Sequence, residues 1–147
     1  MKRALPGGFE LDDDRDRVDV DAVHRFLTEE AYWVPGRSRE TIERLVREST
    51  RVLAAYAPDG SLAGFARVMS DSSNMAWLGD VFVLPEHRGR GLGTGLVREA
   101  VEHPAYRELA WYLGTRDAHG LYAKFGFVPA DPGRTMTRSR VDRKSVV

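Results

Sequence analysis

Apolar residues recur at a helical spacing in the first third of the chain. One apolar stripe begins after Asp19 or Asp21 and reaches about residue 30, and a second begins after Ser38 and reaches about residue 49. Aspartate and serine are favoured at helix N-termini because their side chains accept hydrogen bonds from the first free backbone N–H groups. The pattern therefore predicts two consecutive amphipathic helices.

Shorter apolar runs of strand length dominate the middle of the chain. Three of them cover residues 51–57, 62–70 and 75–84, and Pro58-Asp59-Gly60 between the first two has the composition of a tight turn. A helical stripe then begins at about Gly91 and ends at His103-Pro104. The other expected elements are a short strand at 9–11, a strand at 109–114, a helix at 118–125, and extended segments at 127–129 and 135–140.

This order of elements predicts an α/β (α+β) fold with a mixed, mostly antiparallel central sheet flanked by helices. At 147 residues the chain suits one domain over residues 1–147, with a core at about 9–140 and a flexible tail at 141–147. Lysine plus arginine and aspartate plus glutamate both number 22, so no net charge favours nucleic acid or a membrane as partner. No apolar stretch has the length of a membrane span or the place of a signal peptide.

The chain contains no cysteine. This excludes disulfides, thiolate metal sites and a cysteine nucleophile, and it fits a cytoplasmic location. The histidines show no metal-ligand spacing, so we expect no metal. An antiparallel sheet edge with exposed aromatic residues would permit a homodimer.

The segment from residue 81 to residue 96 carries the clearest functional signal. An apolar run ends there, and glycine then occupies every second position from residue 89 to residue 95, where a helix begins. Because glycine has no Cβ, an anionic group can approach the backbone N–H groups, and the helix dipole adds positive potential. The expected ligand is a pyrophosphate, to which Arg88 and Arg90 can add ionic contacts.

Two better-known glycine motifs do not match this segment. The chain lacks the Gly-Lys-Ser/Thr of a nucleoside-triphosphate loop, and the third glycine of G-x-G-x-x-G would fall on Thr94 or Leu96. Arg88-x-x-Gly91-x-Gly93 instead resembles the acyl-CoA-binding motif of the GNAT superfamily of N-acetyltransferases. The run from Ala118 to Phe127 is similar to a second motif of that family, Ala-x-x-Leu-Tyr-x-x-x-Gly-Phe. The resemblance covers about residues 9–140.

The resemblance implies that acetyl-CoA is the co-substrate. Its pantetheine arm would lie in the gap between the strand at 75–84 and the next strand, and it would bond to the backbone of Val81, Phe82 and Val83. Thr115 stands where many members have an asparagine, seven residues before the motif tyrosine. The residues that match the pyrophosphate-binding run are Arg88, Gly89, Arg90, Gly91, Leu92, Gly93 and Thr94.

Tyr122 matches the tyrosine that protonates the departing CoA thiolate in this family. A phenol with a pKa of about 10 can protonate a thiolate whose conjugate acid has a pKa of about 8.5 only if it is held close in a dry site. Some members carry a glutamate base on the strand after the loop helix, but the equivalent residue here is Ala110.

Asp80 is the first candidate for the base that takes the proton from an amine substrate. Its apolar neighbours Trp77, Leu78 and Val81 are expected to raise its pKa by desolvation. Two other interpretations stay open, namely that Asp80 binds a cationic substrate or caps a turn. Asp71 on an adjoining turn is a second carboxylate.

His119, three residues before Tyr122, is a third candidate base, or else a solvated residue in the first turn of a helix. Tyr32 and Trp33, between the first two helices, are candidates for an acceptor-binding wall or for an anchor of that connection. With the two aspartates nearby they would suit a cationic amine.

The sequence thus predicts an enzyme that transfers an acetyl group from acetyl-CoA to a primary amine of a small molecule or peptide. The amine would attack directly in a ternary complex, because the chain has no cysteine and no serine in a nucleophile-elbow pattern. Two alternatives remain. One is a non-catalytic acyl-CoA-binding module or sensor, and the other is an acetyltransferase that modifies protein N-termini or lysines.

Overall fold

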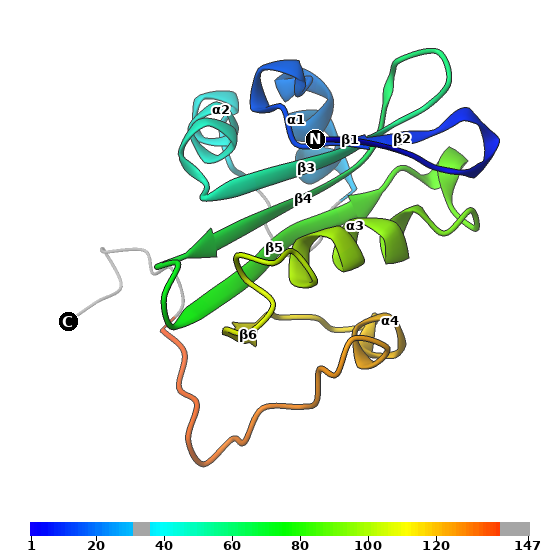
Figure 1. The fold of residues 1–147 in the computed structure, drawn as a ribbon. Coiled ribbons are helices and arrows are strands. Elements are labelled where there is room, and N and C mark those ends of the chain that lie inside the picture. The colour runs from blue at the N-terminus through cyan, green and yellow to red at the C-terminus, as the bar shows by residue number, and fades with distance from the viewer. Residues whose placement is uncertain (31–35, 139–147) are drawn as a thin grey trace.

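The centre of the molecule is a six-stranded sheet in a computed structural model that describes residues 1–30 and 36–138. The strands lie side by side in the order in which they occur in the chain (Figure 1). Neighbours are antiparallel from β1 to β5, whereas β6 runs parallel to β5. This confirms the predicted fold class. The strands are β1 (Lys2–Ala4), β2 (Glu10–Asp12), β3 (Arg51–Tyr56), β4 (Leu62–Ser70), β5 (Met75–Val83) and β6 (Ala110–Tyr112).

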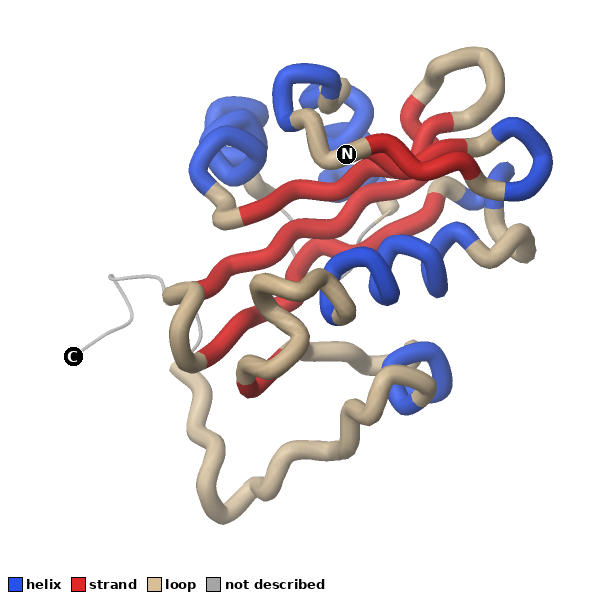
Figure 2. Tube along the Cα trace, in the orientation of Figure 1, coloured by secondary structure: helices blue, strands red, loops and turns tan. Residues whose placement is uncertain are grey.

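Helices cover both faces of the sheet (Figures 1 and 2). The helices α1 and α2 lie on one face, and α3 and α4 lie on the other. As predicted, the side chains of Asp19 and Ser38 cap α1 and α2, since they accept hydrogen bonds from the N–H groups of Ala22 at 3.0 Å and Thr41 at 3.1 Å. The helices are α1 (Val20–Glu29), α2 (Arg39–Glu48), α3 (Leu92–Val101) and α4 (His119–Ala123), with 3-10 turns η1 (Pro6–Gly8), η2 (Arg15–Arg17) and η3 (Pro85–His87).

Strand β3 shows how the sheet divides the apolar core in two. Successive side chains of a strand point to opposite faces, so Leu53 and Ala55 pack in the cluster under α3, whereas Val52, Ala54 and Tyr56 pack under α1 and α2. All six residues of β3 are buried. The strand next to it, β4, is buried over most of its length as well, which makes these two strands the rigid support for β5.

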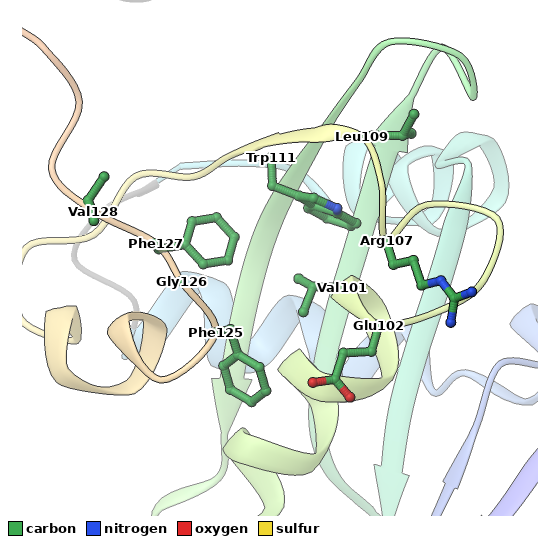
Figure 3. A pocket seen from close by; sticks show the side chains of 9 residues that line it. All are labelled: Val101, Glu102, Arg107, Leu109, Trp111, Phe125, Gly126, Phe127 and Val128. Atoms are coloured by element: carbon green, nitrogen blue, oxygen red, sulfur yellow. The ribbon is translucent and has the colours of Figure 1, made fainter.

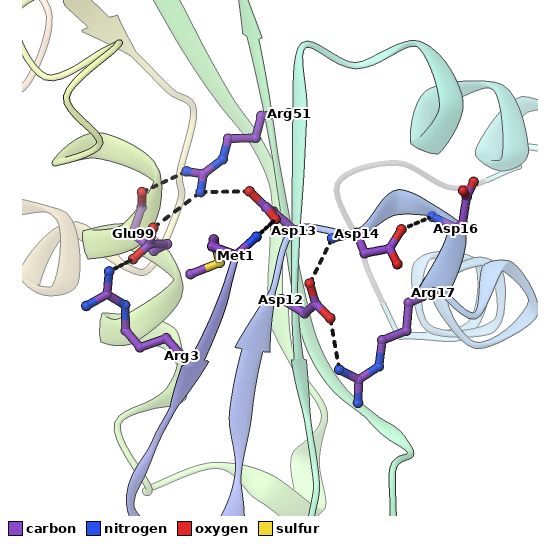
Figure 4. Close-up of polar contacts among 9 residues, drawn as sticks. All are labelled: Met1, Arg3, Asp12, Asp13, Asp14, Asp16, Arg17, Arg51 and Glu99. Carbon is purple, nitrogen blue, oxygen red and sulfur yellow. Dashed lines mark hydrogen bonds and ion pairs between the residues drawn. The ribbon is translucent and has the colours of Figure 1, made fainter.

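A buried arginine ties helix α3 to the sheet (Figure 4). The side chain of Arg51 on β3 is 8% exposed, and it donates to the backbone carbonyl of Glu99 at 2.9 Å and to the carboxylate of Glu99 at 3.2 Å. It also donates to the carboxylate of Asp13, at 3.3 Å. Arg3 of β1 pairs with the same Glu99 at 3.0 Å. These contacts fix the C-terminal half of α3 and therefore the axis along which its N-terminus points.

The two ends of the sheet differ from the sequence prediction. Strand β1 was not predicted, because its residues are exposed and carry no alternating pattern. The predicted strands at 127–129 and 135–140 are wrong over residues 127–138, which form loop and turn. Pro129 and Pro132 lack the N–H that a ladder needs, and Met136 is 95% exposed, so its side chain does not hold this part of the chain on the sheet. Residues 139–147, which include the predicted tail, lie outside the described part.

Candidate active site

Strands β5 and β6 diverge and leave a cavity between them. Their pairing ends where Trp77 lies beside Tyr112. Beyond this pair, residues 78–81 of β5 and residues 114–118 after β6 line a cavity of about 530 Å³. The other side chains in its wall are Arg37, Arg67, Trp77 and Tyr122. The cavity lies between the two strands at which a gap for pantetheine was predicted, and binding of pantetheine there stays a prediction.

A β-bulge shapes the β5 wall of this cavity. Arg67 of β4 pairs with Gly79 and Phe65 pairs with Phe82, so two residues of β5, Asp80 and Val81, lie opposite one residue of β4. Asp80 has a φ of +51°, in the left-handed region that aspartate tolerates better than most residues. The bulge removes Val81 from the regular ladder and places it in the cavity wall.

Two arginines bind the side chain of Asp80. Arg37 donates to both of its carboxylate oxygens, at 2.8 and 3.1 Å, and the Nε of Arg67 donates at 2.6 Å. Burial alone raises the pKa of the Asp80 carboxyl, but the hydrogen bonds and positive charges of Arg37 and Arg67 outweigh it and hold the pKa below its ordinary value. The expectation of a raised pKa for Asp80 is therefore wrong.

Sequence reasoning missed both of these arginines. Arg67 interrupts an apolar run on a buried strand, and a charge in such a place needs a partner, so a signal for Arg67 was present. Arg37 gave no comparable signal, because it follows Gly36 in a polar connection just before α2. Its side chain is 6% exposed, and its Nε has no hydrogen-bond partner within residues 1–30 and 36–138.

Tyr122 lies on α4 and is 8% exposed. Its ring packs edge-on against Phe127, with 6.0 Å between the ring centroids, and it lines the cavity opposite β5. Burial raises the pKa of the phenol, and the negative charge of Asp117 raises it further. The hydroxyl therefore keeps its proton at neutral pH. Thr115 also lines the cavity, where its Oγ1 accepts a hydrogen bond from the N–H of Ala118 at 3.0 Å and caps the turn that enters α4.

The glycine loop lies beyond the end of β5 and leads into α3. Gly89 and Gly91 both have a φ of +81°, which side chains rarely adopt, and no atom lies within 4 Å of the position that a Cβ would take at either residue. The first hydrogen bond of α3 runs from the N–H of Gly95 to the carbonyl of Gly91, at 3.0 Å. The N–H groups of residues 92–94 precede that bond, and the residue at the N-cap position has no side chain to satisfy them. The loop therefore combines free donors with open space.

The two arginines of this loop differ in their contacts. The Nε of Arg88 donates to the carbonyl of Val83 at 3.0 Å, so this side chain holds the loop against the end of β5. The guanidinium of Arg90 lies 5.3 Å from the centroid of the Phe9 ring. Ionic contact of either arginine with a pyrophosphate stays a prediction. Phe82 is 5% exposed and stacks on Phe26 in the core under α1 and α2, so any part it takes in binding is through its backbone.

Two other predicted site residues, Asp71 and His119, do not line the cavity. One carboxylate oxygen of Asp71 accepts hydrogen bonds from the backbone N–H groups of residues 73, 74 and 75, which hold its pKa below the ordinary value. Asp71 therefore caps the turn between β4 and β5. His119 is the exposed first residue of α4. Tyr32 and Trp33 lie outside the described residues.

A second cavity, of about 410 Å³, lies between the end of α3, β6 and the segment after α4 (Figure 3). The rings of Trp111, Phe125 and Phe127 surround it, and Glu102 and Arg107 supply its charged side chains. Of the predicted site residues that the structure describes, none belongs to its wall.

Two further findings concern the part of the chain that the structure describes. It contains no group of three or more histidine, aspartate or glutamate side chains placed to hold a metal ion. None of its helices has both the length and the hydropathy that a bilayer span requires.

Comparison with known sequences gives consistent matches. A family model of the acetyltransferase (GNAT) domain matches residues 48–129. A mycothiol acetyltransferase from Nocardia farcinica is 35% identical over 77 residues, which is 44% of this chain. A streptothricin acetyltransferase from Streptomyces lavendulae is 41% identical over 54 residues, which is 36% of this chain. The matched segments span only 25% and 29% of the lengths of these two relatives.

Solved structures match over nearly the whole chain. A protein from Xanthomonas campestris pv. campestris, provisionally described as an acetyltransferase of the GNAT family, superposes with a TM-score of 0.86 at 36% identity, over 97% of this chain and all of that one. A protein from Deinococcus radiodurans superposes with a TM-score of 0.74 at 20% identity, over 95% of this chain and 94% of that one. The second match supports the fold alone.

Proposed function

Because the chain belongs to the GNAT family of acetyltransferases, we propose that it transfers the acetyl group of acetyl-CoA to a primary amine. The observation that carries the proposal is the cavity between β5 and β6, which has Tyr122 in one wall, and the glycine loop that follows β5. The two relatives with partial matches are both named acetyltransferases, which supports acetyl as the group transferred.

The glycine loop fits the diphosphate of CoA. The backbone N–H groups of residues 89–94 would donate to it, because the left-handed glycines turn the chain without adding a side chain. The pantetheine arm would follow β5 past the point where β6 leaves it, bonded to the backbone of Val81, Phe82 and Val83. Thr115 faces the same space from the opposite wall.

Transfer then needs one bond to form and one to break. The nitrogen of the neutral amine attacks the thioester carbonyl carbon, the C–N bond forms, the C–S bond breaks, and the nitrogen gives up one proton as the amide forms. The hydroxyl of Tyr122, which is protonated at neutral pH, gives its proton to the sulfur, and the proton that the nitrogen loses returns to the phenolate directly or through water. Because its raised pKa makes Tyr122 a weaker acid than a free phenol, the transfer depends on close placement of the hydroxyl in the cavity. The rate would come from holding the two substrates together, since the chain has no cysteine to carry a covalent intermediate.

We assign Asp80 a positioning role in place of the predicted role of base. Its oxygens already accept three hydrogen bonds from guanidinium groups, and its lowered pKa makes it a weak base. The pairs anchor the bulge of β5 to β4 and to the connection before α2. The amine would lose its proton to water before attack, or enter the site already neutral.

The experiment compares Tyr122→Phe with Tyr112→Phe. Tyr112 on β6 is 46% exposed and does not line the cavity, so it is a matched control for the loss of one phenol hydroxyl. Thiol release from acetyl-CoA should fall about 100-fold or more in Tyr122→Phe, within the range for loss of a general acid, while CoA affinity stays the same. Tyr112→Phe should keep its activity.

Two outcomes would contradict the proposal. If the wild-type protein binds CoA but acetylates no amine, it is the acyl-CoA-binding module. If Tyr122→Phe is as active as Tyr112→Phe, acetyl transfer stands but Tyr122 is not the acid.

A further inference from the structure

Two arginines share one carboxylate in the wall of the cavity. Within the described residues, the ion pairs of Arg37 and Arg67 both end on Asp80. The three side chains are 6%, 15% and 5% exposed, in that order. This buried cluster therefore carries one more positive than negative charge.

The rest of the cavity wall does not supply the missing negative charge. Its other charged residues are Arg116 and Asp117, which are opposite in sign. The stretch just before Gly36 reads Ala-Tyr-Trp-Val-Pro at residues 31–35 and contains no carboxylate. The remaining side chains of the wall are uncharged.

An uncompensated charge away from water is costly unless an opposite charge and hydrogen bonds meet it. A guanidinium group binds carboxylate and phosphate well, because its N–H groups form a planar fork that matches two oxygens. Both Nη atoms of Arg37 donate to Asp80, and the Nη1 of Arg67 contacts the Oγ of Ser49 and the Sδ of Met69. The hydrogen-bonding capacity left in the cluster therefore lies in the other Nη of Arg67 and in the Nε of Arg37, which lacks a partner among the described residues.

We propose that the acceptor carries an anionic group, a carboxylate or a phosphate, close to the amine that is acetylated, and that Arg67 and Arg37 bind this group. The inference rests on the proposed function and names the substrate class for it. It replaces the expectation that the two aspartates suit a cationic amine, because Asp80 is already paired and Asp71 caps a turn outside the cavity.

The test measures kcat/KM with acetyl-CoA for matched acceptors that differ only in the anionic group. One pair is an α-amino acid and its α-amide, such as alanine and alaninamide, and the other is O-phosphoethanolamine and ethanolamine. Spermidine represents the purely cationic class. The amine of alaninamide has a lower pKa than that of alanine, so a larger share of alaninamide is neutral and able to attack. A preference for alanine must therefore come from recognition of its carboxylate.

In at least one pair the anionic member should have a kcat/KM about 10-fold or more above its neutral partner, as expected for a charge-assisted contact. The pair that shows the preference tells carboxylate from phosphate. Arg67→Gln should bring the ratio close to one and raise KM, while the affinity for CoA is unchanged. This variant leaves Arg37 and Asp80 as a neutral pair, so it is expected to fold. Arg67→Lys should restore part of the preference, and Arg44→Gln, an exposed arginine of α2, should keep the wild-type ratio.

The outcomes separate this inference from the proposed function. Equal or faster transfer to the neutral member in both pairs, or faster transfer to spermidine than to either anionic acceptor, overturns the inference and leaves acetyl transfer intact. CoA binding without transfer to either anionic acceptor overturns the inference too. Failure to bind CoA overturns the proposed function itself.

Discussion

Replacement of Asp80 by asparagine should be the most damaging single isosteric change in the site. The side chain of Asp80 is 5% exposed and lies 2.8 Å from Arg37 and 2.6 Å from Arg67. Asparagine keeps the shape but removes the charge, and in either orientation its amide N–H₂ group faces at least one guanidinium donor. Two guanidinium groups would then remain buried without a counter-charge.

The size of the effect follows from the two ion pairs. Opposite charges about 4 Å apart attract by about 4 kcal/mol each at an effective dielectric constant of about 20. Repulsion between the arginines and the hydration that the carboxylate regains on unfolding both reduce that sum. Removal of one partner from a buried pair typically costs about 3–5 kcal/mol, and we expect a loss in this range for Asp80→Asn.

Urea unfolding at about pH 7 measures this loss. The control is Asp16→Asn, which changes an exposed carboxylate and should leave the free energy of unfolding within about 0.5 kcal/mol of the wild type.

The pH dependence of the free energy of unfolding gives a second check. The folded-state pKa of Asp80 is lowered, so its stabilisation is present above the unfolded pKa of about 3.9 and disappears as the pH falls through the folded pKa. The difference between wild type and Asp80→Asn should therefore shrink in acid. A loss below about 1 kcal/mol at neutral pH, or a difference that does not change in acid, would refute this reasoning.

Three other predictions follow from the same geometry. Gly91 and Gly60 have φ values of +81° and +88°, and both have open space where a Cβ would lie, so Gly91→Ala and Gly60→Ala should each lower the free energy of unfolding by about 1–2 kcal/mol. Only Gly91→Ala should also weaken CoA binding in calorimetry, and equal CoA affinities of the two variants would contradict the assignment of the loop. The hydroxyl of Tyr56 is buried without a partner among the described residues, and burial raises its pKa to about 12. Tyr56→Phe removes this hydroxyl, so the free energy of unfolding in urea should stay equal or rise by about 1 kcal/mol, and a clear loss would contradict this account. The pH at which kcat/KM levels off should follow the amine pKa of each acceptor, because the lowered pKa of Asp80 makes it a weak base. The same pH for all acceptors would indicate a base on the protein.

Most of the fold could be predicted because its signals are local. The bounds of β4 agree with the prediction, since an apolar run between two turn sequences leaves little freedom. The capping residues Asp19 and Ser38 were likewise readable one helix at a time. The prediction was wrong at both edges of the described fold because the signals there are not local. Exposed β1 has no pattern, and the segment that contains Met136 would need a partner strand that no local signal can guarantee.

The site divides in the same way. The glycine loop was predictable, because positive φ values at Gly89 and Gly91 require the residue type that marks the motif. The charge cluster was not, because Arg37 and Asp80 are 43 residues apart and meet only when α2 packs on the sheet next to the bulge. Predicting the pKa of Asp80 from its sequence neighbours therefore accounted for burial but missed the two charges that outweigh it.

Titration of the wild-type protein with coenzyme A in a calorimeter tests the central claim most directly. If the backbone amides of the glycine loop hold the diphosphate, saturable heat should appear at micromolar concentrations, and pantetheine, which lacks the diphosphate, should bind far more weakly. No heat at millimolar coenzyme A, or equal affinity for pantetheine, would contradict the account.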